Sequence, residues 1–229
     1  MDYSIYRIMR VFFLCLVFLL PGFLFCQNNT DPLWNYRTGR DLENRNRMSE
    51  AEIYYNEAVR LASEEISRNA ASRDSYAALT MTLQRQRKYP DVITWGERGL
   101  RLYTDEYRIV EIMGEAYFYL EDYDRSMRFM QRYANAVPQG DRTGVAYFFM
   151  GEIFRQRRQF LHADIAYSTA VWLEPSIALW WYRLGIVREA AGDIAHATSA
   201  YDRSLRLNPN YREARDALGR TRRWTGENE

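Results

Sequence analysis

The sequence predicts an all-α protein built as a solenoid of antiparallel helix pairs. The first observation is the stretch 178–211, which has an ordered set of aromatic, small and proline positions: Trp181, Leu184, Gly185, Ala197, Tyr201 and Pro209. The second is that matching residues recur at intervals of 34 to 37 residues over most of the chain. The third is an apolar residue at the same phase of each copy, directly after the expected turn: Tyr89, Tyr123, Phe160 and Ile194. A single hairpin cannot bury its own apolar face, so we expect the copies to stack.

The stretch 178–211 is the best-preserved unit and has the pattern of one helical hairpin. Trp181 and Leu184 lie three residues apart, which places them on one face of a first helix. Gly192 ends that helix and Pro209 ends the second, as glycine and proline commonly do. The pattern therefore predicts two helices joined by a tight turn.

Three further units precede this one, and their fidelity decreases towards the N-terminus. The unit 34 residues earlier keeps nearly every slot: Tyr147, Met150, Gly151, Phe154, Ala163, Tyr167, Ala170 and Pro175. The next lies another 37 residues back, and we place the added residues in the polar run 139–144; its slots are Val110, Met113, Gly114, Tyr117, Ser126, Met130, Tyr133 and Pro138. The earliest keeps only the hydrophobic slots: Tyr76, Leu79, Leu83, Val92, Leu100 and Leu102.

This spacing resembles the tetratricopeptide repeat (TPR), whose pattern is W-x₂-L-G, then A-x₃-aromatic, then a closing proline. The resemblance covers nearly the whole chain after residue 26. It implies an all-helical, right-handed superhelix with a concave groove, and a binding scaffold rather than a reaction. Trp172, Trp180 and Trp224 lie outside the family's slots, and we expect them to pack between repeats.

The chain divides into an export segment, a repeat array and a cap. We expect this layout in chain order: signal peptide 1–26, tether 27–32, degenerate first repeat 33–72, repeats 73–106, 107–143, 144–177 and 178–211, and a capping helix with a tail 212–229. In the degenerate repeat, Ser49 and Glu52 have the spacing of a capping box and predict a helix start ahead of an apolar face, although 33–46 is only weakly periodic. The last helix is rich in charged residues, as expected at the solvated end of a solenoid.

The N-terminal segment has the features of a secretory signal peptide. Arg7 and Arg10 precede the apolar run 11–20, which is shorter than the roughly 20 residues of a membrane-spanning helix. We therefore expect export to a bacterial periplasm, with the body either soluble or tethered to a membrane. An uncleaved anchor is the alternative.

Cys26 has two interpretations. It is either the last residue before signal-peptidase cleavage or the lipidated first residue of a lipoprotein, followed by a polar tether. The second resembles a bacterial lipoprotein signal but places Phe25 where a small residue is expected. Because the other cysteine is Cys15, we expect no disulfide within the exported body, and membrane contact only through the N-terminal segment or a lipid.

Composition argues against several classes of function. The 31 basic and 30 acidic residues give a net charge of +1, which offers no electrostatic case for binding nucleic acid or an anionic membrane. No glycine-rich phosphate loop follows a strand, so no cofactor is expected. His162 and His196 lie one repeat apart, which is too far to share a metal ion. We therefore expect no catalytic residue, no metal site and no enzymatic activity.

The informative positions are those that face the groove in TPR arrays, mainly on the first helix of each pair. Mapped onto this sequence, the candidate partner-binding residues are Arg108, Glu111, Glu115, Phe118, Tyr119, Phe148, Glu152, Arg155, Tyr182, Ile186 and Glu189. TPR co-chaperones that hold an acidic peptide C-terminus carry basic residues and asparagines at several of these positions, where this chain has glutamates and aromatic residues. This combination suits an apolar or basic peptide segment or a helix. The alternative is that the glutamates only solvate these helix faces.

The function expected from the sequence is that of a non-enzymatic scaffold or adaptor. Its partner would be another envelope protein or a peptide, held in the groove. Two alternatives stay open: a surface-exposed adhesin or host-interaction protein, and a carrier of a small ligand.

Overall fold

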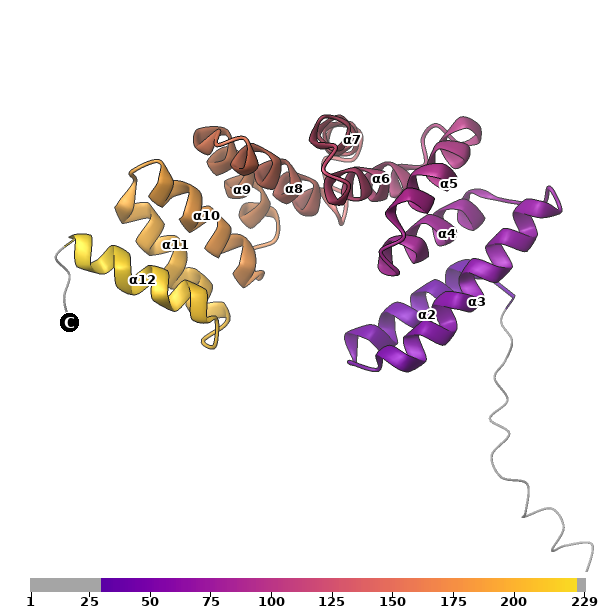
Figure 1. Cartoon of the computed structure of the whole chain (residues 1–229), viewed down its shortest axis with the longest axis horizontal. Coiled ribbons are helices and arrows are strands. Elements are labelled where there is room, and N and C mark those ends of the chain that lie inside the picture. Colours follow the sequence, from indigo (N-terminus) through magenta and orange to yellow (C-terminus); the bar gives the residue numbers. More distant parts are fainter. Residues whose placement is uncertain (1–29, 226–229) are drawn as a thin grey trace, which may run out of the picture. The chain divides into compact units, whose positions relative to one another are not determined.

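A computed structural model describes residues 30–225 of the chain. Over this range it has eleven helices and no strand, which confirms the predicted all-α solenoid. The helices form five pairs and a final single helix (Figure 1): α2 (Pro32–Asn44) with α3 (Met48–Ser67), α4 (Arg73–Arg85) with α5 (Tyr89–Leu102), α6 (Tyr107–Tyr119) with α7 (Tyr123–Ala136), α8 (Thr143–Gln156) with α9 (Phe160–Leu173), α10 (Ala178–Ala190) with α11 (Ile194–Leu207), and α12 (Arg212–Thr225). The predicted signal peptide 1–26 and Cys26 lie outside the described residues. No helix that the structure describes has the length and apolar character needed to cross a bilayer.

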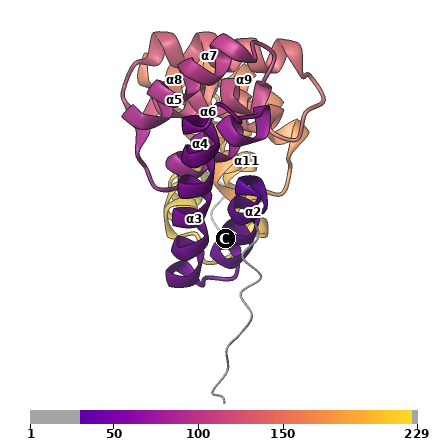
Figure 2. The same ribbon diagram turned by 90° about the vertical axis from the view of Figure 1, so that its right-hand side faces the viewer.

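Each helix packs mainly against its neighbours in the chain. Contacts run through every consecutive pair from α2 to α12, and the first helices of successive pairs also meet, as α2 with α4, α4 with α6, and α6 with α8. Figure 2 shows α2 and α3 side by side, in the same hairpin arrangement as the later pairs. Nearest-neighbour packing of this kind is typical of a solenoid.

The turns within the pairs share one backbone geometry. In each pair, one residue takes a positive φ between 57° and 85°: Asn46, Arg87, Glu121, Arg158 and Gly192. The next N–H then donates back into the first helix, as from Asp193 to the carbonyl of Arg188 at 2.9 Å. The predicted apolar residues after the turn are confirmed as the first residues of α5, α7, α9 and α11. Four of the five turns lack glycine, at a conformational cost of about 1 kcal/mol each, so helix packing rather than local preference determines the turn.

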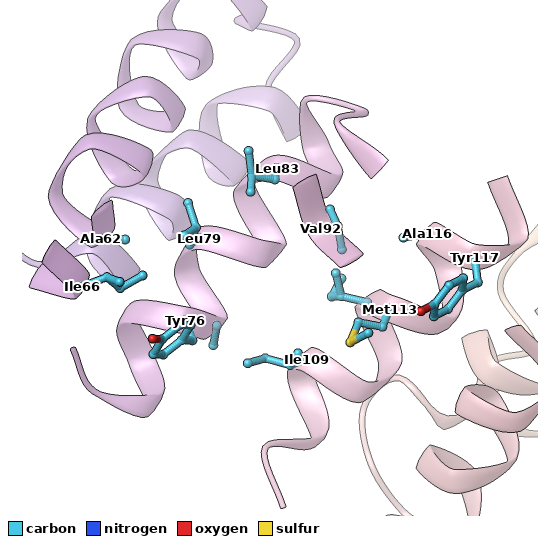
Figure 3. Packing of buried hydrophobic residues seen from close by; sticks show 12 residues of the cluster. Ala62, Ile66, Tyr76, Leu79, Leu83, Val92, Ile109, Met113, Ala116 and Tyr117 are labelled. Carbon is cyan, nitrogen blue, oxygen red and sulfur yellow. The ribbon is translucent and has the colours of Figure 1, made fainter. Parts of the chain in front are cut away.

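The core lies between the pairs. Figure 3 shows its N-terminal part, where Ile66 of α3, Tyr76 and Leu79 of α4, Val92 of α5 and Met113 of α6 converge. All five are buried, and each contributes about 1.5–3 kcal/mol by leaving water. Of the slots assigned to the earliest, most degraded unit, Tyr76, Leu79, Leu83 and Val92 are buried core positions and Leu100 packs against them, whereas Leu102 is exposed and its slot is not a core position.

Small residues bring the paired helices together. A Cβ added at Gly185 of α10 would lie 2.4 Å from the ring of Tyr201 on α11. Two other pairs repeat this contact at 2.7 Å: Gly151 with Tyr167, and Gly39 with Tyr55. The hydroxyl of each tyrosine donates to a glutamate near the end of the first helix, as Tyr201 does to Glu189 at 2.6 Å.

The tryptophans outside the family's slots behave differently from one another. Trp180 is buried and stacks on Phe148, with ring centroids 5.3 Å apart. Trp172 and Trp224 are instead 79% and 61% exposed, so the expectation that they pack between repeats is wrong. Trp181, which occupies the family's first slot, is only half-buried, and its indole N–H donates to the carbonyl of Pro175.

Candidate functional site

A cavity of about 610 Å³ opens between α2, α4, α6 and the loop that joins α7 to α8; we call it the α2–α4–α6 cavity. Four of the eleven predicted groove residues line it: Arg108, Glu111, Glu115 and Tyr119. Its volume lies within the range of ligand-binding sites in proteins.

Arginine dominates the charge of this cavity. Five arginines line it, from three helices and the loop: Arg37, Arg40, Arg85, Arg108 and Arg142. Three acidic residues oppose them: Glu111, Glu115 and Asp141. The lining therefore has an excess of positive charge, unlike the chain as a whole.

Arg142 holds two buried carboxylates at once. Its Nη2 lies 2.8 Å from Oε1 of Glu111 and also contacts Oε1 of Glu115. Both glutamates are less than 5% exposed, and Gln84 donates a further hydrogen bond to Glu115 at 2.5 Å. Glu111 and Glu115 therefore do not solvate the helix face, and a role for them in binding a basic partner stays a prediction.

Burial changes the acidity of this cluster. It raises the pKa of Glu115 well above the usual range, and the charge of Glu111 raises it further, outweighing Arg142. One arginine between two carboxyls is neutral when one of them keeps its proton. We therefore place that proton on Glu115.

The other arginines of the cavity differ in how far their charge is neutralised. Arg108 is bound by Glu106 and Asp74, each at 2.7 Å, and Arg85 lies 3.8 Å from Glu43. Arg37 and Arg40 are exposed on α2, and neither forms an ion pair with another residue of 30–225. These two guanidinium groups are available to an anion.

The predicted groove residues of the C-terminal half make contacts within the array. Glu152 is buried between Arg155 at 2.7 Å and Arg183 at 3.0 Å, and it accepts a hydrogen bond from Tyr167. Glu189 accepts from Tyr201 and pairs with Arg220 of α12 at 2.7 Å.

The apolar candidates also pack internally. Phe118 packs edge-on against Phe149 with centroids 5.0 Å apart, and Tyr182 lies 5.0 Å from Tyr211. Phe148 stacks on Trp180, and Ile186 packs on the small cluster between α11 and α12. The structure thus brings four of the eleven residues to the cavity, and a binding role for the others stays a prediction.

Arg85, like Arg108, lies at a position that faces the groove in TPR arrays, whereas the other three arginines of the cavity were not identified from the sequence. Arg37 and Arg40 lie on α2, in the unit with the weakest repeat pattern, and Arg142 follows the lengthened loop after α7. The three-residue lengthening of that loop was the available signal, because an insertion beside a groove commonly adds side chains to it.

Replacing Glu115 tests the assignment of its proton. The unfolded carboxyl titrates near 4.5 and the folded one at higher pH, so the folded state binds more protons between these values. Stability therefore falls as pH rises through that window. In Glu115→Gln we expect a melting temperature, followed by circular dichroism, that varies less between about pH 5 and pH 8. The exposed Glu213→Gln should keep the wild-type slope; an unchanged slope in Glu115→Gln would contradict the assignment.

The described residues hold no group of three or more His, Cys, Asp or Glu side chains that could bind a metal ion. His162 and His196 are both exposed, and the ring of His196 bonds to Asp193 of its own turn.

Comparisons with known proteins agree with the fold. Residues 178–211 match the family model described as tetratricopeptide repeat. A MamA structure (RS-1 ArsTM double mutant) is 16% identical with a TM-score of 0.61, and covers 80% of this chain and 97% of its own. YrrB, described as a TPR protein with an unusual peptide-binding site, is 16% identical with a TM-score of 0.56, and covers 84% of this chain and 94% of its own. MamA from AMB-1 is 17% identical with a TM-score of 0.57, and covers 78% and 92%. No curated protein sequence matches. The chain is thus an all-α solenoid of the tetratricopeptide type, with a tetratricopeptide repeat at residues 178–211.

Proposed function

We propose that this protein is a non-enzymatic scaffold that binds an acidic segment of a partner protein in the α2–α4–α6 cavity. The observation that carries the proposal is the set of five arginines on one cavity, two of them without an ion pair to any described residue. Arginine forms paired hydrogen bonds with carboxylates, which suits aspartate, glutamate or a chain terminus. The peptide-binding site described for YrrB, a protein of similar fold, supports a peptide as the ligand.

The charge distribution argues against the basic or apolar segment that the glutamates first suggested. Glu111 and Glu115 are already bound by Arg142, so a cationic partner would have to compete with a contact inside the fold. Such a partner would also approach Arg37 and Arg40, which repel it.

The setting we propose for this scaffold is the bacterial envelope, where the partner is another envelope protein. The support is the sequence of residues 1–26, with its basic start and apolar run. The second candidate, a surface-exposed adhesin, would bind its partner through the same repeat array. Protease digestion of intact cells distinguishes the two, because an adhesin is cleaved and a periplasmic scaffold is protected.

A direct binding measurement tests the acidic-segment proposal. The probe is a fluorescein-labelled peptide of glutamate and serine, with a second peptide in which glutamine replaces glutamate, read by fluorescence anisotropy. We expect the glutamate peptide to bind more tightly, and its affinity to fall as salt is raised. In Arg37→Ser with Arg40→Ser, the affinity should fall about 10-fold or more.

The matched control is Arg98→Ser with Arg101→Ser, which removes two exposed arginines at the same spacing on α5, away from the cavity lining. It should leave binding unchanged. Equal affinity for the two peptides, or equal loss in both variants, would refute the proposal. If native mass spectrometry showed a co-purifying small ligand that prevents the peptide from binding, the protein would instead be a carrier of that ligand.

A further inference from the structure

The outer face of α9 carries an apolar stripe that the fold does not use. Leu161, Ile165 and Trp172 are 72%, 66% and 79% exposed. They lie four and then seven residues apart, with Thr169 between the last two, and so share one face along about 16 Å of helix. A helix whose apolar residues extend to its exposed side normally has a partner there.

The equivalent positions of the other second helices are mostly polar. On α3, aligned through Tyr55 with Tyr167, they are Ser49, Ile53, Glu57 and Arg60, and only Ile53 among them is apolar. The same register gives Pro90, Thr94, Arg98 and Arg101 on α5, Asp124, Arg128, Arg132 and Asn135 on α7, and Ala195, Ser199, Arg203 and Arg206 on α11. These three helices pack into the array as α9 does. Packing of the array therefore does not require an apolar residue at these positions, and the stripe on α9 has another cause.

Opposite charges lie at the two ends of the stripe. Arg158 is exposed in the turn before α9, and no ion pair joins it to any residue of 30–225. Beside Trp172, a hollow of about 590 Å³ is lined by Asp141 and Glu174, which also lack an ion pair within the described range. The stripe thus runs from a cationic end to an anionic end.

We infer that the α9 stripe is a self-association surface, on which α9 of one copy packs antiparallel against α9 of a second copy. A two-fold axis near the middle of the stripe sets Leu161 against the partner's Trp172. The same axis brings Arg158 to the partner's Glu174, and the reciprocal contact follows by symmetry. Antiparallel helices also oppose their dipoles favourably. A surface that is apolar in its middle and opposite in charge at its ends complements itself, which is why the occupant is a second copy.

Leu161, Ile165 and Trp172 do not line the α2–α4–α6 cavity, although Asp141 lines both this cavity and the hollow beside Trp172. Three large side chains from each copy make a small interface. We therefore expect reversible dimerisation with a Kd on the order of 10 μM.

Sedimentation velocity of the full chain over a concentration series tests this inference. Wild type should pass from monomer to dimer, and Ile165→Asp with Trp172→Asp should weaken association at least 10-fold. The control Thr94→Asp with Arg101→Asp changes the same register on α5 and should associate as wild type does. All variants share one N-terminal segment, so a difference between them arises from the substituted face; helicity and melting temperature confirm that each is folded.

A charge swap tests the antiparallel arrangement itself. Arg158→Glu should weaken the dimer, because it places two acidic side chains opposite each other. Adding Glu174→Arg should restore association, because the contact then again joins one acidic and one basic side chain. A wild-type monomer at all concentrations, a dimer that tolerates Ile165→Asp with Trp172→Asp, or a charge swap without recovery would overturn the inference.

Discussion

Gly185→Ala is expected to lower the free energy of unfolding by about 3 kcal/mol, although alanine is the better helix former. The new Cβ would lie 2.4 Å from the ring of Tyr201, closer than real contacts allow. That ring cannot easily move, because Tyr201 is fully buried and its hydroxyl is bonded to Glu189. Urea denaturation followed by circular dichroism measures the loss.

Gly219→Ala is the matched control, since both glycines lie inside helices. The nearest atom to a Cβ at Gly219 is 3.7 Å away, so we expect a gain of about 0.5–1 kcal/mol from helix propensity. In a Tyr201→Leu background, Gly185→Ala should cost less free energy of unfolding than it does in wild type. Leucine is smaller than tyrosine and leaves room for the new methyl group. A Gly185→Ala variant as stable as wild type would contradict a close approach of α10 and α11.

The same contact explains which parts of the fold could be predicted. In 178–211 the small and aromatic slots are all present, so the sequence alone predicts the hairpin. The first pair keeps Gly39 and Tyr55 at the same separation of 16 residues, with the same ring contact. We expected only a weak first helix there, because 33–46 has weak periodicity, although Ala51 and Ala58 also keep the small slots of the second helix.

Neighbouring aromatic residues were harder to assign than small ones. Trp180 and Trp181 are adjacent, and helix periodicity cannot tell which indole enters the core when both are apolar. The structure buries Trp180 because Phe148 of α8 offers a ring to stack on. That partner lies 32 residues away in the chain, and only the packing of α8 beside α10 reveals it.

The candidate site was predictable only in part, for a similar reason. The register of the first helices correctly placed Arg108, Glu111 and Glu115 on one side of the array. It could not predict that Arg142 would form an ion pair with both glutamates, because a loop residue has no helical register. The sequence therefore indicated the position of the cavity, while its chemistry depended on a tertiary contact.

Arg142→Ala is expected to lower the free energy of unfolding by about 3 kcal/mol near pH 8. Glu111 and Glu115 stay buried in this variant but lose the arginine they share, and an unpaired buried carboxylate is costly. Each then gains stability by taking a proton, so the loss should shrink as pH falls towards about 5. Urea denaturation at the two pH values measures both effects.

Two variants identify the buried carboxylates as the source of this loss. Arg40→Ala removes another arginine of the same cavity, but one without an ion pair in the described range, and should change stability by less than about 0.5 kcal/mol. Adding Glu115→Gln to Arg142→Ala should recover part of the loss at pH 8, since only one buried carboxyl is then left without the arginine. If Arg142→Ala were equally destabilised at both pH values, packing rather than charge would be its cause. The contact of Arg142 with Glu111 and Glu115 would then contribute packing to the cavity wall, and it would not oppose binding of a basic partner to these glutamates.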